Sequence, residues 1–370
     1  MMLVLAIVSL VIACLPAIML AKNLPVFLFP VPSENQSAAD KGRAEMQKDD
    51  SNLAGVSVLI PARDEQDGIA ASVNAALNSQ GVNVEVLVLD DHSTDRTAEI
   101  VQQMAGMDPR VRYLVGEELL EGWNGKQFGC KQLAEAAAYS TLVFIDADVR
   151  LKSDALQRLV TCYAAKGVGL LSVFPHQETR TILEMWIIPL MHYVLLGFCP
   201  LHRMRMDPSP ALAAGCGQLF MTNQDAYRRA GTHAAIRGSR HDGVKLPRAY
   251  REAGLMTDVY DGQELAECRM YHSAPEVIRG VLKNATEGLA AAKLIFPFTI
   301  LLIGGSVLPL ILLVWSLAVG DSFAALRLSQ SWLGVLCHAP ATLLFVILQW
   351  IAFLNHLAGR QVAWRGRTTS

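Results

Sequence analysis

The sequence carries little charge and no recognisable cysteine or histidine pattern. Only 18% of its 370 residues are charged, 52% are hydrophobic, and the formal net charge is −2. A chain so close to neutral lacks the basic surface of nucleic-acid-binding proteins, so we expect no nucleic acid as a partner. The seven cysteines form no CxxC pair, and the nine histidines form no HExxH motif. The sequence therefore predicts reduced thiols in a cytoplasmic compartment, rather than disulfides or a zinc site.

Three long segments without Asp, Glu, Lys or Arg account for much of the hydrophobic excess. Residues 2–21, 294–319 and 333–355 are each long enough to cross about 30 Å of hydrocarbon. A cleavable signal peptide is the alternative for the first segment. It is disfavoured because no Lys or Arg precedes the run and its apolar core is longer than usual. We predict one N-terminal anchor and two C-terminal transmembrane helices.

Basic residues set the expected orientation of these spans. Positive charges follow the first span and the last span, whereas the loop between the second and third holds only Arg327. The positive-inside rule then places the middle of the chain and the C-terminus in the cytoplasm. We predict a multi-pass inner-membrane protein divided into an anchor (1–22), a linker (23–54), a cytoplasmic domain (55–290), two transmembrane helices (291–358) and a cytoplasmic tail (359–370).

A fourth apolar stretch, residues 182–201, lies inside the predicted domain and contains Glu184, Pro189 and His192. One interpretation is an amphipathic element that lies in the membrane interface or covers an acceptor groove. The other is a buried core helix. The sequence leaves both open.

Short apolar strands alternate with helical stretches from residue 55 onward. Strands are predicted at 56–60, 84–89, 111–115, 141–145 and 168–174, and helices at 67–78, 95–105, 125–138 and after Ser153, with Ser93, Thr94, Asp95 and Ser153 as candidate caps. This order predicts an α/β fold with a mostly parallel sheet and helices on both faces. Ligands of such sheets bind beyond the carboxyl ends of the strands.

Acidic residues end two of the predicted strands. Asp90 and Asp91 end the second, and Asp146 and Asp148 end the fourth. Residues two apart in an extended segment point to the same side, so Asp146 and Asp148 could share one ligand. Hard carboxylate oxygens suit Mg²⁺ or Mn²⁺ beside a diphosphate. The alternative is a solvated turn.

The residues after the first strand, PARDE (61–65), offer Arg63 for phosphate and Glu65 for a base or ribose. Taken alone this is a weak signal, because a charged loop after a strand is usually just solvated.

Three motifs taken in order resemble the nucleotide-sugar half of family-2 glycosyltransferases, which are inverting and have the GT-A fold. They are PARDE (61–65), DDHSTDRT (90–97) and DAD (146–148), and the resemblance covers roughly residues 55–290. It implies that Asp91 and Glu65 contact the nucleotide base or ribose. It also implies that Asp148, helped by Asp146, holds the metal and the diphosphate. Pro61, Arg63 and Lys126 are expected on the same donor side.

The acceptor half carries a candidate general base in HDGVKLPRAY (241–250). Family members have an acidic pair here whose Asp is the base, and Asp242 matches it, while His241 departs from the pattern. The chemistry needs one carboxylate at the acceptor hydroxyl, opposite the leaving diphosphate. An Asp at a helix start is otherwise an ordinary cap.

Two further segments belong to the acceptor half of the resemblance. Gly215, Gly217 and Gln218 in GCGQLFM would let an acceptor approach the backbone, with close packing as the alternative. Arg269 and Tyr271 stand where processive relatives carry QxxRW, which is absent here. Arg269 is expected to assist the departing diphosphate, or else to belong to a juxtamembrane basic helix that binds lipid headgroups.

The GWNGK run (122–126), the RMY run (269–271) and the terminal spans resemble a subgroup associated with hopanoid or carotenoid lipids. We therefore expect a single sugar transfer from a nucleotide-diphospho sugar to a polyprenoid, hopanoid or carotenoid acceptor at the cytoplasmic membrane face. One rival is a polyprenyl-phosphate sugar synthase with Arg203 and Arg205 at its acceptor site. Another is a membrane scaffold with a vestigial domain, which the intact set Asp91, Asp146, Asp148 and Asp242 argues against.

Overall fold

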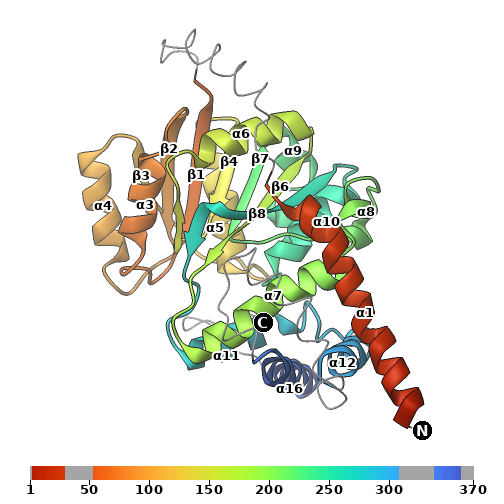
Figure 1. Cartoon of the computed structure of the whole chain (residues 1–370). Helices are drawn as coiled ribbons and strands as arrows, with labels where there is room; N and C mark the ends of the chain where they lie inside the picture. The colour runs from red at the N-terminus through yellow and green to blue at the C-terminus, as the bar shows by residue number, and fades with distance from the viewer. Residues whose placement is uncertain (1, 30–52, 308–336, 360–370) are drawn as a thin grey trace.

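A mixed β-sheet organises the residues that the computed structural model describes, which are 2–29, 53–307 and 337–359 (Figure 1). Its eight strands lie in the order β3-β2-β1-β4-β7-β6-β8-β5. The strands are β1 (Gly55–Ala62), β2 (Asn83–Asp90), β3 (Val111–Val115), β4 (Thr141–Ile145), β5 (Val149–Leu151), β6 (Leu170–Gln177), β7 (Leu219–Asn223) and β8 (Thr257–Cys268).

The five strands predicted from the sequence are all present, with β6 starting two residues later than expected. The expectation of a mostly parallel sheet holds for β3, β2, β1 and β4. Beyond β4 the sheet is mixed, because β7 runs antiparallel to both of its neighbours and β5 runs antiparallel to β8. The alternation pattern missed the other three strands: β5 has only three residues, β7 follows directly on the glycines of GCGQLFM, and acidic side chains in β8 conceal its apolar positions.

Helices cover both faces of the sheet, as the pattern predicted. α3 (Ile69–Leu77), α4 (Thr97–Met107) and α6 (Ala155–Lys166) pack on one face, and α5 (Gly125–Ala136), α9 (Gln224–Arg229) and α10 (Asp242–Glu252) on the other. The two-residue repeat of a strand explains the division, since Val58 and Ile60 face the first layer and Leu59 faces the second.

The predicted helix starts are partly correct. Asp95 accepts a hydrogen bond from the backbone N–H of Thr97 at 2.9 Å, but the N-cap of α4 is Arg96 and none of Ser93, Thr94 and Asp95 occupies that position. The predicted cap at Ser153 is wrong, because Asp154 precedes α6 and no side chain there caps the helix. Backbone hydrogen bonds to preceding turns take over this role at α6.

A second group of helices lies together below the sheet in Figure 1. It contains α7 (Ile182–Phe198), α11 (Ala274–Ala285), α12 (Ile295–Leu302), the π-helical turn η4 (Ile303–Val307) and α16 (His338–Leu357), with α1 (Met2–Phe27) running alongside. Its shared core includes Ile187 of α7, Val277 and Val281 of α11, and Phe345 of α16.

Two helices in the described part of the chain are long and apolar enough to cross a membrane, Ile7–Phe27 and His338–Leu357. They correspond to the first and third predicted spans. The second predicted span, 294–319, begins as α12 and then runs into residues 308–336, outside the described ranges. Most of the predicted linker and of the C-terminal tail lies outside them too.

Helix α7 occupies most of the ambiguous stretch 182–201. Asn23 of α1 closes the C-terminal end of α7, because its side chain donates to the carbonyls of Leu196 (2.8 Å) and Cys199 (2.6 Å). Ile187 and Leu196 are buried, whereas Ile182 at the helix start is 64% exposed. The structure therefore favours a buried helix over an amphipathic interface element, with α7 packed between the sheet domain and the candidate membrane helices.

Candidate active site

The predicted donor residues lie where β1 and β2 end side by side. Ala62 pairs with Asp90 at the end of the parallel register, and the Asp91 N–H donates to the Ala62 carbonyl at 2.8 Å. Arg63 crosses from the first loop to the second. Its Nη1 donates to the Asp91 carbonyl at 2.5 Å and lies 3.8 Å from the Asp91 carboxylate. The sequence motifs PARDE and DDHSTDRT thus form one surface.

Side-chain to backbone hydrogen bonds join these two loops. The N–H of Asp64 donates to Ser93 Oγ at 3.0 Å, and the N–H of Thr94 donates to Asp64 Oδ1 at 2.7 Å. The N–H of Glu65 donates to Thr97 Oγ1 at 2.8 Å. Asp64 has a left-handed backbone (φ 52°), which is uncommon outside glycine and is held in place by these bonds.

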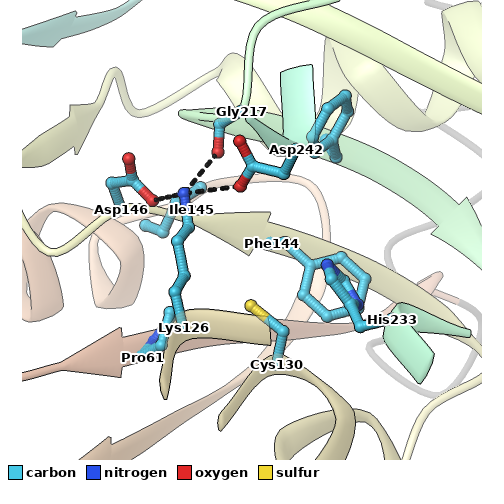
Figure 2. Close-up of a pocket in the computed structure, with 10 residues that line it drawn as sticks. Pro61, Lys126, Cys130, Phe144, Ile145, Asp146, Gly217, His233 and Asp242 are labelled. Carbon is cyan, nitrogen blue, oxygen red and sulfur yellow. Dashed lines mark hydrogen bonds and ion pairs between the residues drawn. The ribbon is translucent and has the colours of Figure 1, made fainter. Parts of the chain in front are cut away.

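Lys126 connects the fourth strand to the acceptor half (Figure 2). Its Nζ lies 2.5 Å from Asp146 Oδ1 and 2.8 Å from Asp242 Oδ2, and it donates to the Gly217 carbonyl at 3.1 Å. These residues come from α5, the β4 end, α10 and the segment before β7. The pocket around them is lined by Pro61, Lys126, Cys130, Phe144, Ile145, Asp146, Gly217, Phe220, His233 and Asp242.

The ion pairs set the charge states of this cluster. Burial alone would lower the pKa of Lys126, but Asp146 and Asp242 outweigh it and raise that pKa well above its ordinary value. Burial likewise tends to raise the pKa of Asp242, yet Lys126 holds it below the ordinary value. The pKa of Asp146 is raised by burial and by Asp242. At neutral pH the cluster therefore holds a charged lysine and an ionised Asp242.

Asp148 lies in a buried polar network at the edge of this cluster. Gln177 donates to Gln218 at 2.7 Å, and Gln218 donates to Cys268 Sγ at 3.0 Å. The Cys268 thiol in turn bonds with the Asp148 carboxylate. Burial and the neighbouring Asp146 raise the pKa of Asp148 to about 6, and its Oδ1 is buried with no hydrogen-bond partner.

This arrangement fits a divalent cation of the kind that the resemblance implies. A buried carboxylate oxygen without a partner, next to a second carboxylate, is stabilised by a bound cation. Within the described residues no group of three or more His, Cys, Asp or Glu side chains could hold a metal ion. Asp146 and Asp148 alone would therefore need donor phosphates and water to complete the coordination shell.

The glycines before β7 are explained by their close approach to α10. A Cβ on Gly217 would lie 2.0 Å from Asp242 Oδ1, and a Cβ on Gly243 would lie 2.8 Å from the Gly215 carbonyl. Both contacts are shorter than real Cβ atoms tolerate. The packing alternative thus accounts for Gly215 and Gly217, and Gln218 lies in the network that reaches Asp148.

Arg269 does not line the pocket. Its Nη2 lies 3.6 Å from Glu184 Oε1, and Glu184 is fully buried at the start of α7. Tyr271 is buried against α11, where a Cβ on Gly280 would meet its hydroxyl at 2.1 Å. The RMY run therefore joins the sheet to α7 and α11.

The two arginines considered for a phosphate acceptor are also engaged by carboxylates. Arg205 Nε donates to Asp258 Oδ1 at 2.8 Å, and its guanidinium stacks over Tyr260 at 4.5 Å. Arg203 forms an exposed pair with Asp207 at 3.3 Å. Neither lines the pocket, which weakens the polyprenyl-phosphate alternative.

Two ionisable residues near the pocket were missed by sequence reasoning. His233 lines it and shares a hydrogen bond with the Tyr227 hydroxyl at 2.7 Å; burial lowers its pKa to about 3. Lys283 of α11 interacts electrostatically with Lys126, Asp146 and Asp242, and burial followed by Lys126 lowers its pKa to about 8. Neither stands in a motif, so no sequence signal marked them.

Comparisons with known proteins agree with this geometry. The family described as Glycosyl transferase family 2 matches residues 57–228. The 4,4'-diaponeurosporenoate glycosyltransferase of Staphylococcus aureus (strain USA300) is 28% identical over 247 residues, 65% of this chain and 64% of that protein, so just under two thirds of its length is spanned. The enzyme of the same name from Staphylococcus haemolyticus (strain JCSC1435) is 26% identical over 77% of this chain and 72% of its own length.

Among solved structures, a mannosyltransferase of Pyrobaculum calidifontis in complex with GDP-Man and Mn²⁺ has a similar fold. It is 15% identical, with a TM-score of 0.53, over 95% of this chain and 99% of its own. At this identity the likeness concerns the fold alone. The ordered motifs, the sheet and the family match agree on one point: residues 57–228 form a glycosyl transferase family 2 domain.

Proposed function

We propose that this protein transfers a sugar, with inversion, from a nucleotide-diphospho sugar to a lipid-like acceptor. The observation that carries the proposal is the convergence of Asp146 and Asp242 on one lysine. These carboxylates are 96 positions apart in the sequence, yet both contact Lys126 in one pocket beyond the strand ends. Placing a diphosphate-binding group beside a candidate base is what a displacement at a sugar carbon requires.

The donor would bind along the edge from β2 to β4. Asp91 and Glu65 face the nucleoside in this proposal, and Arg63 fixes the loop that carries Asp91. Pro61 lines the pocket next to Lys126, so the donor's phosphates would pass from the first loop toward the lysine. The bonds between the two loops organise this surface before any ligand arrives.

Asp146 and Asp148 would hold a divalent cation, Mg²⁺ or Mn²⁺. When bound, the cation neutralises charge that develops on the departing diphosphate. The Mn²⁺ in the Pyrobaculum complex supports this choice of ion. The network through Gln218 and Cys268 would keep the Asp148 carboxylate aimed at that ion, as partners behind metal ligands generally do.

Asp242 would be the general base. As the acceptor oxygen bonds to the sugar carbon, the bond to the diphosphate breaks and the acceptor proton passes to the Asp242 carboxylate. Lys126 holds Asp242 ionised at 2.8 Å. A diphosphate beside Asp146 would offer Lys126 a stronger anion, which would draw the lysine toward the phosphates and leave Asp242 available for the proton.

The leaving diphosphate needs cationic support, and in this proposal Lys283 provides it in place of Arg269. Arg269 pairs with buried Glu184, whereas Lys283 interacts with the pocket residues themselves. In this proposal Arg269 acts on the site only through the packing of α7 beside it.

The acceptor is proposed to be a carotenoid-type or related polyprenoid lipid at the cytoplasmic face of the inner membrane. The names of the staphylococcal relatives support a carotenoid-related acceptor. The two helices with membrane-spanning length and composition support anchoring in a bilayer. α7 and α11 pack against α16, one of those two helices, and Lys283 of α11 interacts with the pocket residues. A membrane acceptor would therefore enter from this side.

The direct test is release of nucleoside diphosphate from a panel of UDP-, GDP- and ADP-sugars by the purified full chain in lipid nanodiscs. We expect one donor class to be turned over with Mn²⁺ or Mg²⁺, faster when a hydroxylated carotenoid or terpenoid is present. Release should stop in EDTA, and the product should have the inverted anomeric configuration by NMR.

The exposed acid Asp225 on α9 provides a control. Asp225→Asn should behave like the wild type, whereas Asp146→Asn should lose activity that added metal does not restore. No turnover or binding of any nucleotide sugar would overturn the proposal, and full activity in EDTA would overturn its metal-dependent part.

A further inference from the structure

Glu287 contacts the short loop that presents Asp242, although it belongs to a different part of the fold. It lies in the turn after α11, 45 positions beyond Asp242 in the sequence. The Ser239 hydroxyl donates to Glu287 Oε2, and the Arg240 N–H donates to Glu287 Oε1 at 2.8 Å. Each carboxylate oxygen thus accepts a hydrogen bond from one of two successive residues of the loop.

The same loop leads directly into the base. The His241 N–H donates to Ser239 Oγ at 3.0 Å. The Ser239 hydroxyl therefore connects Glu287 to His241, the residue directly before Asp242. The His241 carbonyl then accepts from the Lys245 N–H at 3.1 Å in the first turn of α10. A charged acceptor bound to two donors gives shorter and stronger hydrogen bonds than neutral partners do.

The turn that carries Glu287 is fixed to a candidate membrane helix. Ala285 and Ala290 flank Glu287 and are both buried in a cluster with Ile295 and with Ala352 of α16. The Ala290 N–H donates to the Ala285 carbonyl at 2.8 Å, which closes the turn. Glu287 is therefore held by the α11–α16 packing on one side and holds the Asp242 loop on the other.

We infer that Glu287 is a positioning residue for the general base and links its placement to the docking of α11 on α16. This inference rests on the proposed function, since it assigns Asp242 as the base. Glu287 is not among the residues that line the pocket. It orients the backbone from which Asp242 projects toward Lys126, and a misplacement of such a group by about 1 Å can cost about 100-fold in rate.

The test is a double-mutant cycle of Glu287→Ala and Ser239→Ala, assayed for transfer and for donor affinity. We expect each single change to lower kcat about tenfold with the donor Kd within about twofold, because the donor loops lie elsewhere. The double variant should lose less than the two single losses combined, since both changes break the Ser239–Glu287 contact, while each also removes one bond of its own to Arg240 or His241. Glu287→Gln should recover part of kcat, because its carbonyl oxygen still accepts one bond.

Glu252 provides the matched control, because it is a carboxylate of α10 that forms an exposed pair with Arg248 at 2.9 Å. Glu252→Gln should keep the wild-type kcat. A kcat for Glu287→Ala within about twofold of the wild type, additive losses in the double variant, or a donor Kd that weakens in parallel would each overturn the inference. Should Glu287→Ala fail to fold, the kcat and donor Kd of Ser239→Ala and Glu287→Gln test the inference in its place.

Asp242→Asn, run in parallel, separates this inference from the proposed function. If it abolishes transfer while the Glu287 and Ser239 variants remain fully active, only the inference fails. If it too remains active, the assignment of the base fails.

Discussion

The two halves of the pocket edge are held together in different ways. The donor loops after β1 and β2 are joined by hydrogen bonds between side chains and backbone, such as Thr94 N–H to Asp64 at 2.7 Å. The Lys126 cluster is held by charge, with Lys126 between Asp146 and Asp242 at 2.5 and 2.8 Å. A surface fixed by its own backbone stays in shape without a ligand, whereas a lysine between two carboxylates can exchange partners when a phosphate arrives. Under the proposed function, the first surface is a preformed nucleoside site and the second is a catalytic site that rearranges when the donor binds.

Removing the candidate base should have the largest effect. Asp242→Asn keeps the shape of the side chain but cannot take up the acceptor proton, so transfer should fall about 100- to 10,000-fold. Donor affinity, measured by calorimetry with a nucleoside diphosphate and Mn²⁺, should change little because the donor loops are independent. Near wild-type transfer by Asp242→Asn would show that Asp242 is not the base and that the Lys126 cluster is not the catalytic site.

Crowding the base should have the next largest effect. A methyl group in Gly217→Ala would meet Asp242 Oδ1 at 2.0 Å and displace it from Lys126. We expect kcat to fall about 100-fold while the donor Kd is retained. Gly106→Ala in α4 is the control, since nothing lies within 4 Å of the place its methyl group would take. Equal kcat values for the two variants would show that Asp242 does not depend on this close contact.

Metal affinity should depend on pH through Asp148. The pKa of this carboxyl is raised from 3.8 to about 6. Between these two values the folded protein binds one proton more than the unfolded chain, so the contribution of Asp148 to stability falls as the pH rises from about 4 to about 6. Binding of Mn²⁺ must release this proton, so its affinity should fall about tenfold per pH unit below about 6 and level off above.

Electron paramagnetic resonance of free Mn²⁺ from pH 5 to 8 would measure this dependence. Asp148→Asn should bind Mn²⁺ more weakly and with a shallower pH profile. A wild-type affinity equal at pH 5 and pH 7 would contradict the assigned metal site.

The smallest effect on catalysis should come from the donor loops' own hydrogen bonds. Thr97→Val removes the hydroxyl that accepts from the Glu65 N–H at 2.8 Å while keeping the buried shape. We expect a loss of about 1–2 kcal/mol in stability, seen as a lower melting temperature, with kcat nearly unchanged. Thr161→Val, at an exposed position of α6, is the control and should leave melting unaltered. A large loss of kcat in Thr97→Val without a change in melting temperature would show that the donor loops act in catalysis rather than only in stability.

The same contrast explains what the sequence could predict. Strands β1 to β4 and the residues after them follow from alternation and from acidic residues at strand ends, because both are local signals. Lys126 was expected on the donor side, but its position between Asp146 and Asp242 depends on α5 and α10 packing on the same face of the sheet. His233, Lys283 and Glu287 reach the site only through tertiary packing, so no pattern in the sequence marked them.

The arginines show the opposite failure. The family resemblance predicted Arg269 at the departing diphosphate, and charge suggested Arg203 and Arg205 for a phosphate acceptor. Each of the three pairs instead with an acidic residue outside the pocket lining. A buried or partly buried cation is stabilised by a nearby carboxylate, and the sequence does not show which carboxylate the fold supplies.

The central claim is that the carboxylates after β4 hold a cation-bridged diphosphate beside Lys126, within the pocket that contains Asp242. The most direct measurement is a crystal structure of the full chain with Mn²⁺ and UDP or GDP, using the anomalous signal of manganese. The account predicts an anomalous peak at Asp148, shared with the diphosphate, and Lys126 Nζ bonded to a phosphate oxygen. Manganese and diphosphate bound away from Asp146 and Asp148, with Lys126 still between Asp146 and Asp242, would contradict it.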